Sequence, residues 1–148
     1  MKSNPLPAVA LLALLAVPVH HARADAAIAA CEQNFQVEGS WANGRTYSTE
    51  ALVEGARYPE ALHQVRDKLV ELGLEIVAVQ ERNGYIRAAQ PVKGGGGGTS
   101  RAPLRGYVTA EGEDRVRVSL QFTIAGGQMT SRKGVMENMC ALVAAAAH

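Results

Sequence analysis

The side chains that most often carry catalysis or bind metals are few and scattered in this sequence. Of its four histidines, only His63 and His148 lie outside the N-terminal segment, so a histidine-based zinc site or a serine–histidine–aspartate triad would depend on His63. Glu111, Glu113 and Asp114 cluster in a predicted turn, where carboxylates are usually solvated. Neither H-E-x-x-H nor G-x-S-x-G occurs. We therefore predict no catalytic residue, no bound metal and no cofactor.

One enzymatic alternative stays open: a small secreted hydrolase whose acidic catalytic residues are dispersed along the chain. Such an enzyme would hold paired carboxyl groups with shifted pKa values in one pocket. The five consecutive glycines at residues 94–98 add no phosphate-binding motif, because neither Gly-Lys-Ser/Thr nor spaced glycines opening a helix accompany them. We interpret residues 93–100 as a flexible glycine-rich loop.

Two cysteines, Cys31 and Cys140, are predicted to form a disulfide. An even pair without a C-x-x-C redox motif is typical of proteins that enter an oxidising compartment. Cys140 lies in an apolar helical stretch, where thiols are usually unreactive. The residues Ile28-Ala29-Ala30-Cys31 also resemble the lipobox of bacterial lipoproteins, which implies lipidation of Cys31 as an alternative, although Arg23 and Asp25 separate Cys31 from the apolar run.

The N-terminus has the order of properties of a cleavable secretory signal. Lys2 precedes an apolar run at residues 8–19, and Ala22-Arg23-Ala24 supplies a small-x-small cleavage pattern. A run of about 12 residues is shorter than the roughly 20 that a spanning helix needs. We therefore predict a signal peptide at residues 1–24 and a single exported domain at residues 25–148, periplasmic or secreted, without a transmembrane segment.

The charge of the predicted mature chain is close to neutral. Residues 25–148 contain 13 basic and 14 acidic residues, so the chain has no overall attraction for nucleic acid or for an anionic membrane. Nucleic acid is therefore not an expected partner. An electrostatic function would have to come from a local patch.

The apolar patterns predict an α+β domain. Alternating residues favour strands at 45–54, 74–80, 85–90, 104–110 and 115–124, whereas helical spacing favours helices at 59–72 and 131–147. Residues 35–44 are interpreted as irregular. The economical arrangement is a two-layer sandwich, a mainly antiparallel five-stranded sheet with two helices on one face.

The turns predict the register of two hairpins. Asn83-Gly84 favours a two-residue turn that places Arg82 opposite Tyr85. The second hairpin needs a three-residue loop at 112–114, because only an odd-numbered loop pairs its apolar residues, Val108 with Val118 and Leu104 with Phe122.

These registers place arginines and tyrosines on the sheet face away from the core. If both hairpins join one sheet, this open face offers guanidinium forks for carboxylates or phosphates beside tyrosine rings. A purely structural role is the alternative, since long arginine stems also shield strand faces. An acidic protein, a glycan or a lipid headgroup surface would suit the predicted compartment. The candidate binding residues are Tyr85, Arg87, Arg105, Tyr107, Arg115 and Arg117.

Residues 58–89, with their helix, the Leu-Gly-Leu-Glu-Ile turn and the Asn-Gly hairpin, resemble the helix-grip domains of BamC-type envelope proteins. The resemblance covers less than a third of the predicted mature chain and includes no chemical motif. It implies an envelope interaction module. The function expected from the sequence is therefore that of a small exported bacterial envelope protein, a non-catalytic binding or assembly module.

Overall fold

The computed structural model describes residues 19–93 and 99–148, and its regular elements form two layers. Most of the predicted signal segment, including nearly all of its apolar run, lies outside the described residues, as do the five glycines at 94–98. The elements in chain order are α1 (Val19–Gln33), β1 (Gln36–Ser40), β2 (Gly44–Glu54), α2 (Glu60–Glu71), β3 (Glu75–Gln80), β4 (Tyr85–Lys93), β5 (Thr99–Ala110), β6 (Arg115–Ile124) and α3 (Arg132–Ala145).

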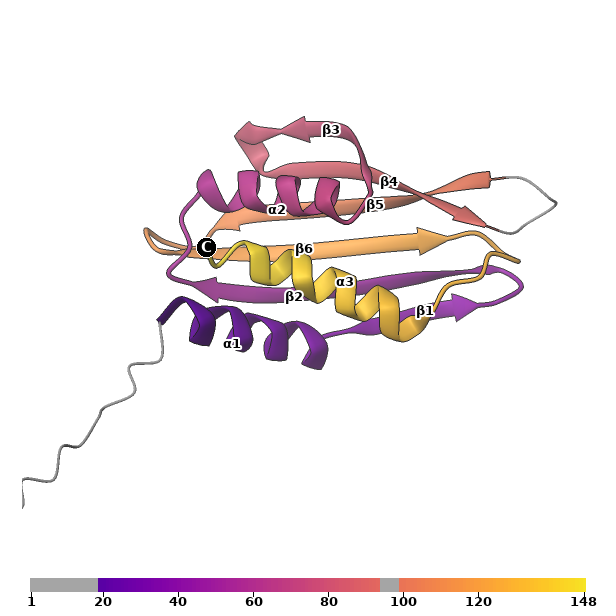
Figure 1. The fold of residues 1–148 in the computed structure, drawn as a ribbon, viewed down its shortest axis with the longest axis horizontal. Coiled ribbons are helices and arrows are strands. Elements are labelled where there is room, and N and C mark those ends of the chain that lie inside the picture. The colour runs from indigo at the N-terminus through magenta and orange to yellow at the C-terminus, as the bar shows by residue number, and fades with distance from the viewer. Residues whose placement is uncertain (1–18, 94–98) are drawn as a thin grey trace, which may run out of the picture.

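The strands form one antiparallel sheet in the order β1-β2-β6-β5-β4-β3. All three helices pack on the same face of this sheet (Figure 1). The α+β class and the two-layer arrangement are therefore confirmed, and the two predicted hairpins do share a sheet through pairing of β4 with β5. The predicted numbers of elements were wrong, because the described residues form six strands and three helices.

The sixth strand, β1, lies in the segment that was predicted to be irregular. All five of its residues are exposed, so its sequence carries no apolar alternation. The strand exists because it pairs with β2, from Gln36 opposite Ser48 to Ser40 opposite Gly44. The helix that was not predicted, α1, is likewise not amphipathic, but it packs on the sheet through Ala27 and Cys31.

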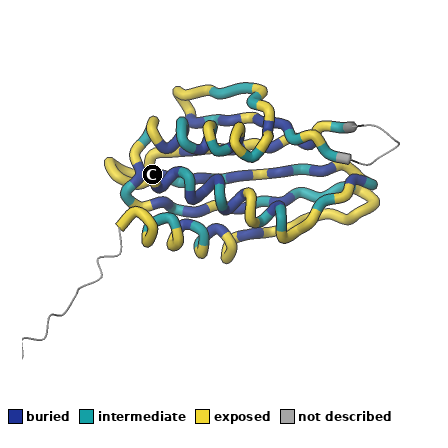
Figure 2. Tube along the Cα trace, in the orientation of Figure 1, coloured by how far each residue is buried: buried dark blue, intermediate teal, exposed yellow. Residues whose placement is uncertain are grey.

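The core lies between the helices and the inner face of the sheet, as the buried segments in Figure 2 show. The even-numbered residues of β6, from Val116 to Ile124, are all buried, and the predicted stripe of α2 supplies Leu62, Val65 and Leu69. Tyr47 on β2 packs between the rings of Phe35 and Phe122, with centroid separations of 6.0 and 6.2 Å.

The predicted disulfide is present. Cys31 on α1 and Cys140 on α3 are joined by an S–S bond of 2.07 Å, across 109 residues of sequence. The Cys31 carbonyl also accepts a hydrogen bond of 2.7 Å from the Thr49 hydroxyl, which ties α1 to β2. A Cys31 sulfur in this disulfide has no free valence for a lipid thioether, so the disulfide and lipidation of Cys31 exclude each other.

The register of the second hairpin was predicted correctly, and that of the first was not. Val108 lies opposite Val118, and Leu104 lies opposite Phe122. In the first hairpin, Tyr85 lies opposite Gln80 instead of Arg82. The reason is that Glu81–Asn83 forms a 3₁₀ turn, which lengthens the connection by two residues.

This two-residue shift leaves the facing of the strands unchanged, because side chains alternate with period two. Tyr85 and Arg87 therefore still point away from the core. The predicted pairing would also turn Val77 toward the core with Ile86, but the register shifts between Ile76 and Ala78, and Val77 is 46% exposed.

Candidate functional site

The open face of the sheet is uncovered by any helix among the described residues (Figure 1). The six candidate residues all lie on this face, since each occupies the strand parity opposite to the buried core residues. They do not form one uniform patch. Their cross-strand partners divide them into two groups with different electrostatics.

The first group consists of two directly opposed pairs on β4 and β5, Tyr85 with Tyr107 and Arg87 with Arg105. The tyrosine ring centroids are 5.0 Å apart, and the ring planes are tilted by 44°. Such a contact holds both rings in place and leaves Tyr107 47% exposed. We call these four residues the Arg–Tyr quartet.

Both arginines of the quartet are exposed and uncompensated. Within residues 19–93 and 99–148, no acidic side chain forms an ion pair with Arg87 or Arg105. Their guanidinium groups lie on neighbouring strands, where opposed side chains are about 5 Å apart at Cβ. The quartet is therefore a small, doubly positive surface beside two aromatic rings.

The second group, Arg115 and Arg117 on β6, is neutralised by acidic neighbours. Arg117 Nε donates a 2.8 Å hydrogen bond to Glu111, and its Nη1 lies 3.6 Å from a carboxylate oxygen of Glu50. The hydrogen bond and charge of Glu111, with the charge of Glu50 beyond it, raise the pKa of the Arg117 guanidinium further above its usual range. Arg115 Nη1 lies 3.8 Å from Glu54. These two arginines are paired with acidic side chains of the protein, unlike Arg87 and Arg105.

Two polar residues next to the quartet were not included in the predicted site. Ser119 lies opposite Tyr107, and Gln121 lies opposite Arg105, both on the open face of β6. Together with Arg105 and Tyr107 they line a shallow depression of about 210 Å³. The register predicted for β5 and β6 already pairs Tyr107 with Ser119 and Arg105 with Gln121. Both polar residues could therefore have been included from the sequence. Glu50 and Glu54, the two acids that β2 brings to the arginines of β6, could not be found this way, because the pairing of β2 with β6 was not predicted.

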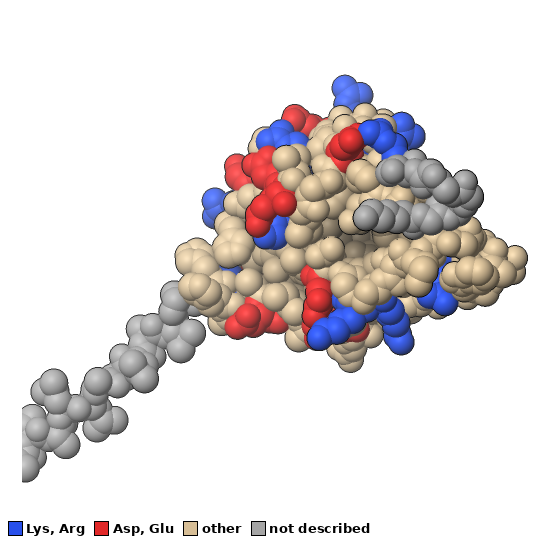
Figure 3. Space-filling model, turned by 45° about the vertical axis from the view of Figure 1, so that its right-hand side comes forward, with Lys and Arg blue, Asp and Glu red and all other residues tan. Residues whose placement is uncertain are grey.

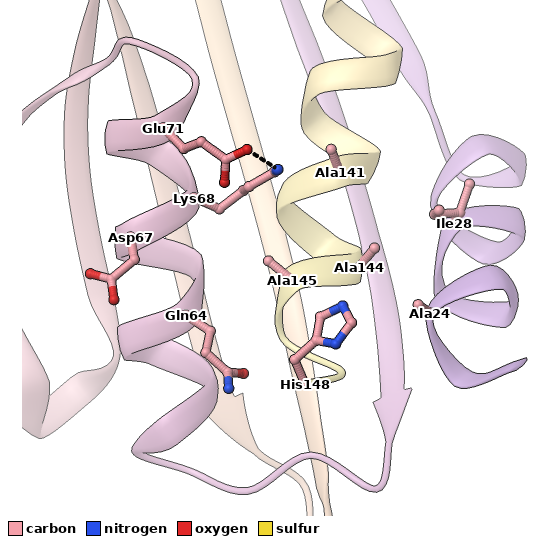
Figure 4. Close-up of a pocket in the computed structure, with 10 residues that line it drawn as sticks. All are labelled: Ala24, Ile28, Gln64, Asp67, Lys68, Glu71, Ala141, Ala144, Ala145 and His148. Atoms are coloured by element: carbon pink, nitrogen blue, oxygen red, sulfur yellow. Dashed lines mark hydrogen bonds and ion pairs between the residues drawn. The ribbon is translucent and has the colours of Figure 1, made fainter. Parts of the chain in front are cut away.

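A groove lies on the helix side of the molecule, between α2, α3 and α1. It has a volume of about 570 Å³ and is lined by small side chains such as Ala141 and Ala144 and by the polar residues of α2. Figure 4 shows its two carboxylates diverging: Glu71 points to Lys68, whereas Asp67 points away. Glu71 accepts a 2.8 Å hydrogen bond from Lys68, and Asp67 accepts from Arg66 at 2.8 and 3.0 Å. The groove therefore does not present the converging acid pair that a hydrolase of the expected type requires.

No group of three or more histidine, cysteine, aspartate or glutamate side chains is placed to hold a metal ion in the part of the chain that the structure describes. In the same part of the chain, no helix is long and apolar enough to cross a membrane.

No protein-family model matches the chain. No curated protein matches its sequence significantly. Among solved structures, the chain is similar to a conserved protein of unknown function, EF2215, from Enterococcus faecalis, with 10% sequence identity and a TM-score of 0.49 over 82% of this chain and 79% of that chain.

Proposed function

We propose that this protein is an exported, non-catalytic binding module that binds an acidic protein surface through the Arg–Tyr quartet. The observation that carries the proposal is the uncompensated Arg87–Arg105 pair beside Tyr85 and Tyr107 on an uncovered sheet face. A cluster of like charges on adjacent strands costs stability. An acidic partner would remove that repulsion and would gain charge-assisted hydrogen bonds.

The shape and composition of the quartet favour a protein over a glycan or a lipid headgroup. Tyrosine and arginine are the residues enriched in the energetically important centres of protein interfaces. The adjacent depression adds Ser119 and Gln121, which can hydrogen-bond to neutral groups of a polypeptide. A lipid surface would more commonly be met by basic residues together with apolar side chains that insert into it.

Export is the second part of the proposal. It rests on the charge, the apolar run and the small-x-small pattern of residues 1–24, and it agrees with the Cys31–Cys140 disulfide. Cleavage after Ala24 would fall within α1 and shorten it. The two fully buried residues of this helix, Ala27 and Cys31, lie beyond the cut and would remain in the mature protein. The resemblance of residues 58–89 to BamC-type domains points to the same setting, an envelope interaction.

The binding proposal is tested with a poly-glutamate peptide as a minimal acidic polypeptide, measured by fluorescence anisotropy at low and high salt. The double variant Arg87→Gln/Arg105→Gln should weaken binding at least about tenfold, which corresponds to about 1.4 kcal/mol. The matched control is Arg115→Gln/Arg117→Gln, which removes the same number of charges from the same face. Because those arginines are already paired with glutamates, the control should retain most of the affinity.

Equal losses in the two double variants would contradict a specific role for the quartet. Binding that does not weaken with salt would contradict the electrostatic basis of the proposal. Vesicles containing anionic lipid provide a further arm: binding to vesicles without binding to the peptide would overturn the protein partner in favour of a lipid one. Mass spectrometry of the exported protein tests the second part, with Asp25 expected as its first residue.

A further inference from the structure

A separate cavity opens on the helix side of the molecule, between the end of α2, the first turns of α3 and the inner face of the sheet. Its volume is about 150 Å³. Its inner walls include Leu104 and Phe122 from the sheet and Met139 and Leu142 from α3, each no more than 3% exposed. The cavity therefore extends from the surface to the hydrophobic core.

The mouth of this cavity is polar and uncharged. Gln90 and Thr130 are half-buried at its rim, and Asn138 is exposed there. Within the described ranges, no side-chain hydrogen bond occupies these three groups. They are free to donate and accept hydrogen bonds from a molecule that enters the cavity.

None of the residues that line the cavity carries a charge. Figure 3 shows a stretch of uncharged surface on this side of the molecule, with charged side chains above and below it. A charged ligand would lose its hydration on entry without gaining an ion pair. The lining therefore selects a neutral ligand.

The size and shape of the cavity limit the ligand further. Pockets for drug-sized molecules usually have volumes of about 300 Å³ or more, whereas an apolar cavity of about 150 Å³ accommodates one benzene ring. The walls include the aromatic ring of Phe122 and the thioether of Met139, and both kinds of side chain make favourable contacts with an aromatic ring. A compact ring fits these contacts better than an extended chain.

We infer that this cavity binds a small neutral aromatic molecule, a single ring with one hydrogen-bonding substituent. The ring lies against Phe122, Met139 and Leu142, and the substituent reaches the mouth and bonds to Asn138. This site lies on the opposite side of the sheet from the Arg–Tyr quartet. Its test is therefore independent of the proposed function.

The probe is phenol, titrated into the isotopically labelled protein and followed by amide chemical shifts. Saturable shifts should concentrate on residues around the cavity. Benzoate, which has the same ring with a charged substituent, should bind more weakly. Shifts that fail to saturate, that spread over the whole surface, or that are equal for phenol and benzoate would overturn the inference.

Two variants localise the site. Asn138→Leu removes a mouth group and narrows the entrance, and it should weaken phenol binding about fivefold to tenfold, the effect expected from losing one hydrogen bond. The matched control is Glu137→Leu, at the neighbouring exposed position of α3 that does not line the cavity. Leu142→Phe should fill the cavity and abolish binding in a protein whose unbound spectrum stays folded. Equal affinity in Asn138→Leu and the parent protein would contradict the assignment whether or not Leu142→Phe folds.

Discussion

Arg87 on β4 lies directly opposite Arg105 on β5, and neither guanidinium has an acidic partner among the described residues. A like-charged cross-strand pair lowers the stability of an antiparallel sheet. Other arginines on the same face do have acidic partners, including Arg115 with Glu54 and Arg101 with Glu75. The repulsion is therefore confined to the residues that we propose bind an acidic partner.

The opposed arginine pair predicts that a substitution which removes the repulsion raises the stability of the protein and weakens its binding of an acidic partner. Arg105→Glu would place a carboxylate opposite Arg87, and it should raise the free energy of unfolding by about 0.2–1 kcal/mol while reducing binding of the poly-glutamate peptide. Chemical denaturation at low and high salt measures the gain, which should shrink as salt screens the new pair.

Arg115→Glu is the control for this prediction, because it places a second carboxylate next to Glu54. It should lower the stability where Arg105→Glu raises it. A loss of stability in both variants would mean that Arg87 and Arg105 do not repel each other measurably, and the electrostatic argument for the quartet would fail.

The sequence predicts the outward positions of Arg87, Arg105 and both tyrosines because alternation has a period of two. The 3₁₀ turn between β3 and β4 moved the register next to the turn by two residues, which left the facing of Tyr85 and Arg87 unchanged. The register of β5 and β6 was predictable because several apolar residues on each strand had to match.

Other features depend on contacts that no local pattern shows. The exposed strand β1 forms because β2 supplies its hydrogen bonds, so its own residues carry no signal. Glu50, the second acidic partner of Arg117 after Glu111, reaches it only through the pairing of β2 with β6. Sequence reasoning therefore identified the open face, but it did not show that Arg115 and Arg117 are paired there with acidic side chains.

The disulfide predicts a large loss of stability on its removal. Because Cys31 and Cys140 are separated by 109 residues, loss of the cross-link increases the entropy of the unfolded chain, and the expected cost is about 4–5 kcal/mol. Denaturation of Cys31→Ala/Cys140→Ala measures this cost against the oxidised parent. Thiol titration of the denatured, unreduced protein should find no free thiol, and two reactive thiols per chain would contradict the prediction.

Removing the hydroxyl group of Tyr47 should not destabilise the protein, although this side chain is buried. This side chain is fully buried, and its oxygen has no hydrogen-bond partner. An unsatisfied buried hydroxyl costs free energy, so Tyr47→Phe should be neutral or should stabilise the protein by up to about 1 kcal/mol. The phenylalanine ring keeps the packing against Phe35 and Phe122. Thermal denaturation measures the change, and a loss above about 1 kcal/mol would indicate that a bound water or another group satisfies the hydroxyl.

Replacing Gly84 with alanine should cause a steric clash in addition to backbone strain. A second glycine allows these two effects to be separated. Its φ is +66°, and an added Cβ would lie 1.8 Å from the carbonyl oxygen of Val108. Gly73 has a similar φ of +82°, but nothing lies within 4 Å of the position its Cβ would take. Both Gly84→Ala and Gly73→Ala should destabilise the protein, because alanine is disfavoured at positive φ by about 1–2 kcal/mol.

Gly84→Ala should cost considerably more than Gly73→Ala, because it must also displace β5. The Gly84 carbonyl accepts a 2.9 Å hydrogen bond from the Val108 amide, and a shift of either strand would lengthen it. Paired urea denaturation curves measure the difference, and amide exchange at Val108 reports whether the contact opens. Equal costs for the two variants would show that the 3₁₀ turn moves freely, in which case the turn would not hold Tyr85 in its position opposite Tyr107.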